Sequence, residues 1–466
     1  MVVRPDAVPV SDATLPAIAD RDIVVPRYDR AGLAPRIAHI GVGGFHRAHM
    51  ALYTDELATT GGDWGIRGIG LLAGDGQMAE ALAAQDHLYT LVERGNGAPT
   101  ARVVGSIVDY RWEPDDAEAA AELLADRAVA IVSLTITEAG YVTGSTTFDV
   151  ITAGLERRRR RGCPPLTILS CDNLPGNGDA ARRATLAAAS TAAPGLEAWT
   201  EQHCAFPNSM VDRITPTTSA ADRAWLHDAL GIDDRWPVVA EPFRQWVIED
   251  TFAAGRPAWE DAGVLFTDAV HEWELYKLRL LNAGHSAIAY LAALAGITFV
   301  DEAMARPEVR AYLDELLSRE AVPSLDEIPG HPREDYVVSV LERFANTGIR
   351  DQIARLCIDG TAKFPTFLVP TIVHQLRHDG PIRCAAAALA GWARYLATVP
   401  VPEQAFDASG DIARRHARRA LADPLLFLSF DAVFPPALRD HGRFRSAFAT
   451  AWARIADEGA LAAMAG

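Results

Sequence analysis

The sequence predicts an α/β fold in which a largely parallel sheet, covered by helices on both faces, precedes a mainly α-helical half. Short apolar runs alternate with helical stretches through the first part of the chain, as expected for strands joined by crossover helices. After about residue 270, long stretches rich in Ala and Leu replace the strand-like runs. The chain has 466 residues, more than one ordinary domain, so we expect two domains, 1–270 and 271–466.

The strands of the first domain are indicated by apolar runs with turn residues at their ends. The first is expected at 36–40, where it runs directly into a glycine-rich turn, and a helix follows at 45–57. A second strand is expected at 64–72. Further strands are indicated at 88–92, 102–108, 128–134 and 166–170, with helices at 116–126 and 179–193.

The second domain is predicted from helical stretches with Gly and Pro at the joints between them. These stretches cover 273–295, 301–319, 335–357, 382–397, 411–421 and 442–464. The boundary near residue 270 is soft, because 236–243 and 264–267 still have the composition of strands. No repeat of solenoid period is visible.

Composition and charge argue against several classes of protein. Hydrophobic residues make up 49% and charged residues 23%, as in soluble globular proteins. The net charge of −17 argues against nucleic acid and anionic membrane as partners, and no apolar run has the length of a membrane span or a secretory leader. Five cysteines without a CxxC pair suit reduced thiols in a cytoplasm. We interpret the one basic run, Arg157 to Arg161, as the solvated end of a helix rather than a binding patch.

The glycine-rich turn is a candidate dinucleotide site. A strand that runs into Gly41, Gly43 and Gly44, with Phe45 opening a helix, lets the backbone approach a pyrophosphate at a helix N-terminus. The sixth position of the usual GxGxxG pattern is His46 rather than Gly, so the helix cannot pack on the strand in quite the usual way. Taken alone, this pattern could also be a glycine turn of another α/β fold.

Asp75, just past the second strand, is the candidate ribose-binding acid. A carboxylate there would accept hydrogen bonds from the adenosine ribose and repel a 2′-phosphate, which favours NAD over NADP. Its separation from Gly41 is longer than usual. On residue type alone, Asp75 could equally be a solvated loop residue.

A strongly apolar helix at the start of the second domain carries an unusual polar set, Glu274, Lys277, Asn282 and His285. At about 100° per residue, Asn282 and His285 share one face, and Lys277 lies about 80° away from His285. Oxidation of a secondary alcohol needs such groups. A lysine can act as base when burial lowers its pKa, and a carboxamide can stabilise the alkoxide. The set could also be a surface Glu–Lys pair with a satisfied core Asn and His.

Metal and nucleophile signatures are lacking. The chain has no HExxH and no Cys–His cluster at zinc spacing, and GxSxG is absent as well. His46 and His49 are two residues apart on the expected helix, but no third ligand is evident. We interpret them as a satisfied pair near the cofactor.

Several blocks, in consistent order and over most of the chain, resemble the polyol-specific long-chain dehydrogenases, or mannitol dehydrogenase family. They are residues 37–49, 132–141, 170–178, 206–216, 241–259 and 359–367, together with the spacing of Lys277, Asn282 and His285. The resemblance implies an N-terminal Rossmann-type domain with an extended sheet, a mainly α-helical C-terminal domain, and substrate between them. It also implies direct hydride transfer to NAD without a metal.

The resemblance also implies roles for individual residues. Lys277 corresponds to the general base, and Asn173 and Asn282 to the two oxyanion donors. His285 corresponds to a substrate-positioning histidine, and Glu274 to a carboxylate on the proton exit path. The remaining positions are Asp212, Arg355 and Lys363 as substrate contacts, and Glu138 in a block that faces the nicotinamide.

The resemblance leaves specificity less sharply defined. Gly74 stands where some members have a further acidic residue, so we expect a less strict exclusion of NADP, and Ala283 stands where relatives often have Gly. Residues 363–372 resemble the mannitol type more than fructuronate reductases, so we expect oxidation of D-mannitol to D-fructose. Fructuronate reductase and D-arabinitol or sorbitol dehydrogenase are the alternatives, and an NAD-binding sensor without catalysis is a distant one. A small-molecule polyol or ketose is the expected partner, and a monomer is weakly favoured.

Overall fold

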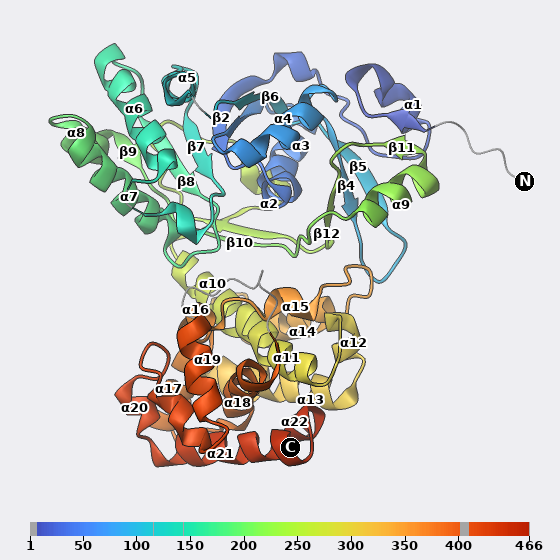
Figure 1. The fold of residues 1–466 in the computed structure, drawn as a ribbon. Helices are drawn as coiled ribbons and strands as arrows, with labels where there is room; N and C mark the ends of the chain where they lie inside the picture. The colour runs from blue at the N-terminus through green and yellow to red at the C-terminus, as the bar shows by residue number, and fades with distance from the viewer. Residues whose placement is uncertain (1–6, 115, 143, 401–409, 466) are drawn as a thin grey trace, which may run out of the picture. The chain divides into compact units, whose positions relative to one another are not determined.

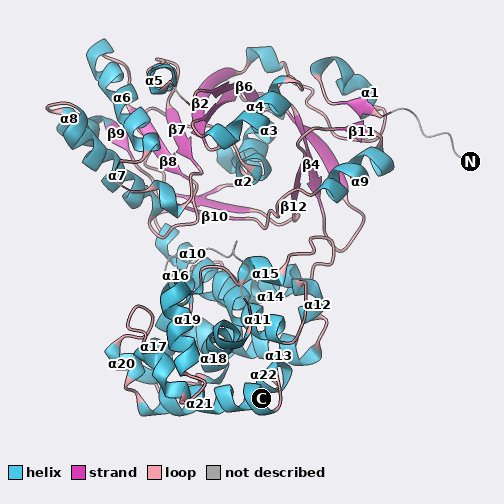
Figure 2. Ribbon diagram, in the orientation of Figure 1, coloured by secondary structure: helices cyan, strands magenta, loops and turns pink. Residues whose placement is uncertain are grey.

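The computed structural model describes residues 7–114, 116–142, 144–400 and 410–465. The chain divides into two compact units, Met1–His271 and Glu272–Gly466. The first is a Rossmann-type α/β domain and the second is mainly α-helical, which confirms the predicted fold class (Figure 2). In the described ranges, no helix has both the length and the apolar character required to cross a membrane.

The first unit is built around a six-stranded parallel sheet with the order β6-β3-β2-β7-β8-β9 (Figure 1). Its strands are β2 (Ala34–Ile40), β3 (Trp64–Gly70), β6 (Ile107–Trp112), β7 (Ile131–Leu134), β8 (Leu166–Ser170) and β9 (Cys204–Ala205). The chain builds outward from β2 to one edge and then returns to build outward from β7 to the other. The switch point, where open α/β sheets bind ligands, therefore lies between β2 and β7.

Helices cover both faces of this sheet. The connections contain α3 (Met50–Thr59), α4 (Gly76–Ala83), α5 (Ala117–Leu124), α6 (Thr146–Arg161), α7 (Asn177–Ala192) and α8 (Leu196–His203). Ile37 of β2 belongs to the core that contains Met50, Leu52 and Leu82, whereas its neighbour Ala38 belongs to the core that contains Leu124 and Leu155. Burial on both faces explains why the runs that form β7 and β8 are mostly apolar in the sequence.

Smaller sheets extend the first unit. In one, β4 (Tyr89–Glu93) pairs antiparallel with β5 (Thr100–Val104) and parallel with β12 (Val238–Ala240). In another, β13 (Gln245–Ile248) pairs antiparallel with β10 (Ser209–Asp212) and parallel with β14 (Leu265–Phe266). The strands expected near 236–243 and 264–267 are thus confirmed. The remaining elements are β1 (Val8–Pro9), β11 (Ile232–Asp233), α1 (Leu15–Ala19) and α9 (Ala220–Leu230).

The helix expected at 45–57 is wrong in one respect, because it is broken at His49. It consists of α2 (Gly44–Ala48) and α3, and His49 between them has φ −124° and ψ −96°. The His49 ring Nε2 is hydrogen-bonded to the carbonyl oxygen of Gln245, 3.0 Å away. This contact across the fold fixes a non-helical residue that local sequence does not reveal.

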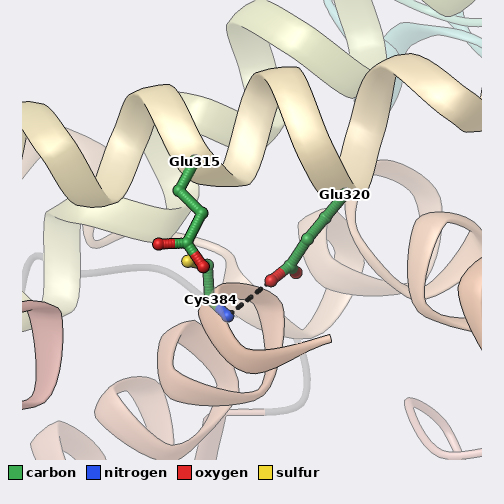
Figure 3. Close-up of side chains that lie close together, drawn as sticks. All are labelled: Glu315, Glu320 and Cys384. Atoms are coloured by element: carbon green, nitrogen blue, oxygen red, sulfur yellow. Dashed lines mark hydrogen bonds between the residues drawn. The ribbon is translucent and has the colours of Figure 1, made fainter. Parts of the chain in front are cut away.

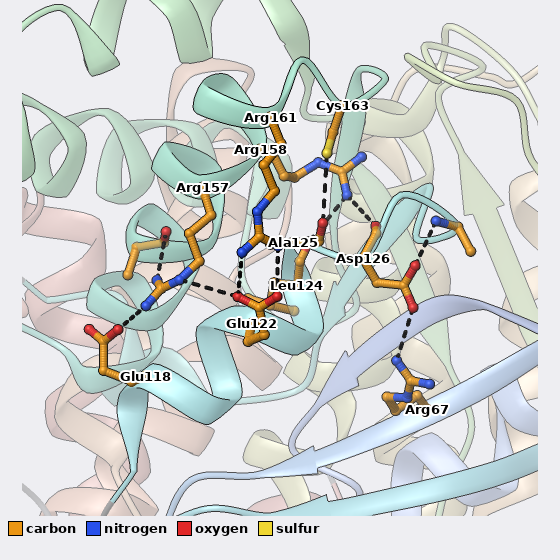
Figure 4. A network of polar contacts seen from close by, with 12 residues as sticks. Arg67, Glu118, Glu122, Leu124, Ala125, Asp126, Arg157, Arg158, Arg161 and Cys163 are labelled. Atoms are coloured by element: carbon orange, nitrogen blue, oxygen red, sulfur yellow. Dashed lines mark hydrogen bonds and ion pairs between the residues drawn. The ribbon is translucent and has the colours of Figure 1, made fainter.

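The basic run forms the end of α6, and Arg160 and Arg161 are exposed as expected, but the interpretation as a solvated helix end is wrong for Arg158 (Figure 4). The side chain of Arg158 is fully buried and donates to the carbonyl oxygens of Leu124, Asp126, Val129 and Pro164. Its neighbours form ion pairs with acidic residues; these pairs are Arg157–Glu118, Arg159–Glu156, Arg160–Glu156 and Arg161–Glu122. The run therefore joins α6 to α5 and offers no cluster of unpaired cations to an anion.

The second unit packs around two buried helices, α11 (Ala283–Leu294) and α18 (Arg383–Thr398). Gly391 lets them approach closely, because a Cβ there would lie 2.6 Å from Leu291. Around them lie α10 (Val270–Tyr276), α12 (Val300–Met304), α13 (Pro307–Glu315), α14 (Arg333–Phe344), α15 (Ile353–Leu356), α16 (Gly360–Phe367), α17 (Val369–Arg377), α19 (Gly410–Arg419), α20 (Pro436–Arg439), α21 (Gly442–Asp457) and α22 (Ala460–Met464). The expected helices at 301–319, 335–357 and 442–464 are each interrupted, the last by Gly459 at φ +94°.

Candidate active site

The glycine turn follows β2 at the switch point of the sheet. Gly41 has φ +94°, and a Cβ there would overlap the carbonyl oxygen of Thr135, so only glycine fits. A Cβ on Gly44 would instead meet its nearest neighbours at 3.7 and 3.8 Å, and one on Gly43 would meet only the Gly41 oxygen at 3.8 Å. Packing within the described residues therefore does not require glycine at position 43 or 44. Bare backbone at these two positions fits the close approach of a pyrophosphate.

His46 replaces the third glycine by stacking on the strand. Its ring lies 3.5 Å from that of His39 in β2, at an interplanar angle of 11°. Burial lowers the pKa of His46 well below its usual value and the pKa of His39 to about 3, so both rings are neutral. Neither ring nitrogen of His46 has a hydrogen-bond partner among the described residues. The interpretation of His46 and His49 as a satisfied pair is therefore wrong for His46. Phe45 in turn stacks on His49, with ring centroids 4.9 Å apart.

Asp75 lies in a short 3-10 turn just beyond β3, the strand next to β2. Its carboxylate accepts a hydrogen bond from the Leu72 N–H at 3.0 Å, and the Trp112 indole donates to the Leu72 carbonyl at 3.0 Å. These contacts fix the turn at the carboxyl edge of the sheet. Gly74 has open space around it, with nothing within 4 Å of a Cβ placed there.

The loops after β7 and β8 carry two more candidate site residues at the same edge of the sheet. Glu138 opens a 3-10 turn after β7, and Asn173 follows the end of β8; both side chains are exposed. Asp172, which sequence reasoning did not select, is buried between these loops and accepts the N–H groups of Ile136 and Thr137. Asp212 lies in β10 and is 2% exposed. Four adjacent strands thus bring the Gly41 turn, Asp75, Glu138 and Asn173 to one edge of one sheet.

In the second unit, the polar helix contains a widened turn. Residues Lys277–Asn282 are π-helical, between α10 and α11. In a π-helix the bonds run from i to i+5, so Lys277 and Asn282 are one turn apart. The expected regular α-helical spacing is therefore wrong across this segment, because the extra residue brings Lys277 toward the face of Asn282. Glu274, Lys277, Asn282 and His285 are all at most 9% exposed.

His285 lies beside a charged cluster. Its ring stacks on Phe344 with centroids 3.8 Å apart and an interplanar angle of 2°. Burial lowers the pKa of His285 to about 3, and Asp351 opposes that shift while Arg355 and Lys363 add to it. The structure thus places the predicted substrate residues Arg355 and Lys363 near His285, within one unit.

Asp351 is a further member of this cluster that sequence reasoning missed. It is 6% exposed and accepts two hydrogen bonds from Arg355, at 2.9 and 2.5 Å. The fork-to-fork geometry of this pair fixes the plane of the guanidinium group. Its position four residues before Arg355 was the only signal in the sequence. Lys363 donates to the carbonyl oxygen of Leu356 at 3.4 Å.

Another polar cluster in the second unit has a structural role (Figure 3). Glu315, Glu320 and Cys384 offer ligand atoms within 4.8 Å of one another. Glu320, however, accepts the N–H groups of Cys384 and Ala385 at 2.7 and 2.9 Å, and Glu315 forms an ion pair with Arg383 at 2.7 Å. Both carboxylates therefore stabilise the N-terminus of α18, where a negative charge is favoured.

These observations define a class of two-domain protein. It has a Rossmann-type domain followed in the chain by a helical domain that carries a buried lysine, asparagine and histidine. The sequence profile of the mannitol dehydrogenase Rossmann domain matches residues 35–261, and that of the mannitol dehydrogenase C-terminal domain matches residues 269–456. The chain belongs to the mannitol dehydrogenase family.

Individual relatives agree with this assignment. The chain is 40% identical to mannitol 2-dehydrogenase of Phaeosphaeria nodorum, over 96% of this chain and 83% of the relative. Its fold matches the solved structure of Pseudomonas fluorescens mannitol 2-dehydrogenase in a ternary complex with NAD and D-mannitol, with a TM-score of 0.88 and 40% identity over 98% and 99% of the two chains. A solved D-sorbitol dehydrogenase matches with the same TM-score at 35% identity, over 98% of this chain and 100% of the other.

Proposed function

We propose that this protein is an NAD-dependent, metal-independent polyol dehydrogenase that oxidises a secondary alcohol to a ketone, with D-mannitol and D-fructose as its substrate pair. The observation that carries the proposal is the buried set on the π-helical segment, Lys277 and Asn282 with His285 one turn further. Family membership and the likeness to the NAD and D-mannitol complex support the substrate and the coenzyme.

The glycine turn fits the coenzyme. The protein has room for a side chain at Gly43 and Gly44, so the absence of side chains there serves to leave the backbone open to a ligand. Asp75, Glu138 and Phe45 complete the proposed coenzyme residues. NAD supplies the hydride acceptor when it is bound. A carboxylate at Asp75 favours NAD, whereas the open space around Gly74 leaves room for the 2′-phosphate of NADP.

The chain's own residues move the proton and hold the oxygen. In the proposed scheme Lys277 takes the hydroxyl proton, and the Asn173 and Asn282 carboxamides donate to the developing alkoxide. Glu274 passes the proton onward from the lysine. Because the base and the donors are side chains, the scheme needs no Lewis acid.

Substrate hydroxyls are assigned to Asp212, His285, Arg355 and Lys363. His285 is neutral at physiological pH, so it can both donate and accept a hydrogen bond. The ion pair with Asp351 holds Arg355 in one orientation, which suits recognition of a hydroxyl at a fixed place. A six-carbon and a five-carbon polyol differ by one hydroxymethyl group, worth about 1–3 kcal/mol in a fitted site.

A second candidate is a dehydrogenase with preference for sorbitol, favoured by the likeness to the solved D-sorbitol dehydrogenase. The test is formation of NADH from NAD with D-mannitol, D-sorbitol and D-arabinitol, and consumption of NADH with D-fructose and D-fructuronate. We expect the highest kcat/KM with mannitol and fructose. A preference for sorbitol would favour the second candidate, and turnover of fructuronate alone would contradict both.

The proposal includes a monomer in a reducing compartment. Support for the compartment comes from the five cysteines, all of which are free thiols. The monomer follows from family resemblance, and sedimentation velocity at micromolar concentration tests it directly.

A further inference from the structure

The loop after β7 contains a residue in a strained conformation. Thr137 has φ +63° and ψ +166°, a region of backbone space that is almost restricted to glycine. The β-branched side chain makes this conformation more costly still. Because the Thr137 side chain is exposed, its own packing does not hold it there.

The buried carboxylate of Asp172 accounts for the strain. One oxygen accepts the Thr137 N–H at 2.7 Å, and the other accepts the Ile136 N–H at 3.1 Å and the Tyr141 hydroxyl at 2.7 Å. These partners lie on both sides of the turn Glu138–Gly140. One side chain, 7% exposed, therefore ties both ends of the loop to the end of β8.

The position of Asp172 couples two groups that the proposed reaction uses. It immediately precedes Asn173, the proposed oxyanion donor, and its bonds define the backbone on which Glu138 sits. Strands β7 and β8 are neighbours in the sheet, so both loops leave the same edge. A carboxylate can accept all three hydrogen bonds at once, whereas the isosteric amide would present an N–H₂ group to at least one donor.

We propose that Asp172 is a positioning residue, whose carboxylate holds Thr137 in its strained conformation and thereby sets the places of Glu138 and Asn173. The inference rests on the proposed function. In this role Asp172 acts on the loop and not on the reacting atoms. Its removal lets the loop relax, and the strain at Thr137 drives that relaxation.

A double-mutant cycle tests this mechanism, because glycine at 137 adopts the same backbone without strain. Asp172→Asn is expected to lower kcat by about 100-fold, the effect of misplacing reacting groups by roughly 1 Å, with a smaller change in the KM for mannitol. Adding Thr137→Gly to that variant is expected to restore kcat by about tenfold. Thr137→Gly alone is expected to change kcat by no more than about twofold, since the native loop is already formed.

Asp234 provides a matched control. It is another buried aspartate of the first unit, and it accepts the backbone N–H groups of Thr90 and Trp236 and the side chain of Gln85. Asp234→Asn is expected to lower the melting temperature, with no recovery of any property on adding Thr137→Gly. If Thr137→Gly restores kcat equally in both aspartate variants, or in neither, the positioning role is overturned.

Two further measurements keep the test decisive. If the Asp172→Asn variant does not fold, Tyr141→Phe takes its place in the test, because it removes one of the three hydrogen bonds to Asp172. Its smaller loss of kcat must likewise be relieved by Thr137→Gly. If the wild-type protein turns over no polyol or ketose, the proposed function fails. The positioning role is then read from crystal structures of the same variants, where Asp172→Asn must move Thr137 out of positive φ; an unchanged φ would overturn it.

Discussion

Replacing Gly44 with alanine is expected to stabilise the coenzyme-free protein and to weaken NADH binding. The new Cβ would lie 3.7 Å from Thr215 and 3.8 Å from Val238, which are ordinary van der Waals contacts. Gly44 opens α2, so alanine restricts the unfolded chain at no cost to the fold. The expected gain is about 0.4–1 kcal/mol in the free energy of unfolding. In the proposed coenzyme site the same methyl group would stand between the backbone and the pyrophosphate, so NADH affinity should fall at least about tenfold, roughly 1.4 kcal/mol.

Gly41→Ala is the matched comparison, with the opposite effect on stability. Its positive φ and the overlap with the Thr135 carbonyl should cost at least about 1–2 kcal/mol of stability. Urea denaturation measures the free energy of unfolding, and quenching of tryptophan fluorescence measures NADH binding. Wild-type affinity for NADH in Gly44→Ala would refute the reasoning, because the backbone of the turn would then not be approached by the coenzyme.

Three further predictions concern charged and titrating groups. Asp351→Asn loosens Arg355, so the KM for mannitol should rise about tenfold with unchanged NADH affinity; a change in kcat alone would contradict this role. Burial lowers the pKa of His39, His49 and His285 to about 3. Below pH 6.5 the unfolded chain therefore binds more protons than the native protein, so the free energy of unfolding should fall from pH 6.5 toward pH 4. A free energy of unfolding that does not change over this range in urea denaturation would contradict the burial of these histidines. Burial raises the pKa of Asp55 to about 6. Between about pH 4 and pH 6, Asp55 is therefore protonated in the native protein but ionised in the unfolded chain. This group should therefore cost about 3 kcal/mol of stability as pH rises from 4 to 6, and the cost should be absent from the pH profile of Asp55→Asn.

Patterns of local sequence were enough to predict the parallel sheet and the glycine turn. Runs rich in apolar residues indicated β2, β3, β7 and β8, since strands buried on both faces are mostly apolar. Gly41 is required by a backbone angle and a close approach, and both are common causes of glycine at a strand end.

Other features depend on contacts between distant residues and were not predictable. The break at His49 is fixed by Gln245, and the arginine at 158 is buried because four carbonyl groups from other segments converge on it. The π-helical turn Lys277–Asn282 has the same apolar periodicity as an α-helix over so short a span.

Among the candidate site residues, side chains proposed to take part in the chemistry were easier to select than those that support them. Lys277, Asn282 and His285 are conspicuous because they interrupt an apolar helix. Asp172 and Asp351 accept hydrogen bonds from a backbone loop and from an arginine, and aspartates at such positions are common in ordinary turns. Only the hydrogen bonds distinguish them.

The most direct test of the central claim is a comparison of wild-type protein with Lys277→Met, which keeps the apolar stem and removes the amine. For each protein, kcat/KM for D-mannitol is measured as a function of pH, alongside the dissociation constant for NADH. We predict that turnover is lost at every pH near neutrality while NADH binds with wild-type affinity. Retention of wild-type turnover by Lys277→Met would contradict the assignment of the base and, with it, the proposed mechanism.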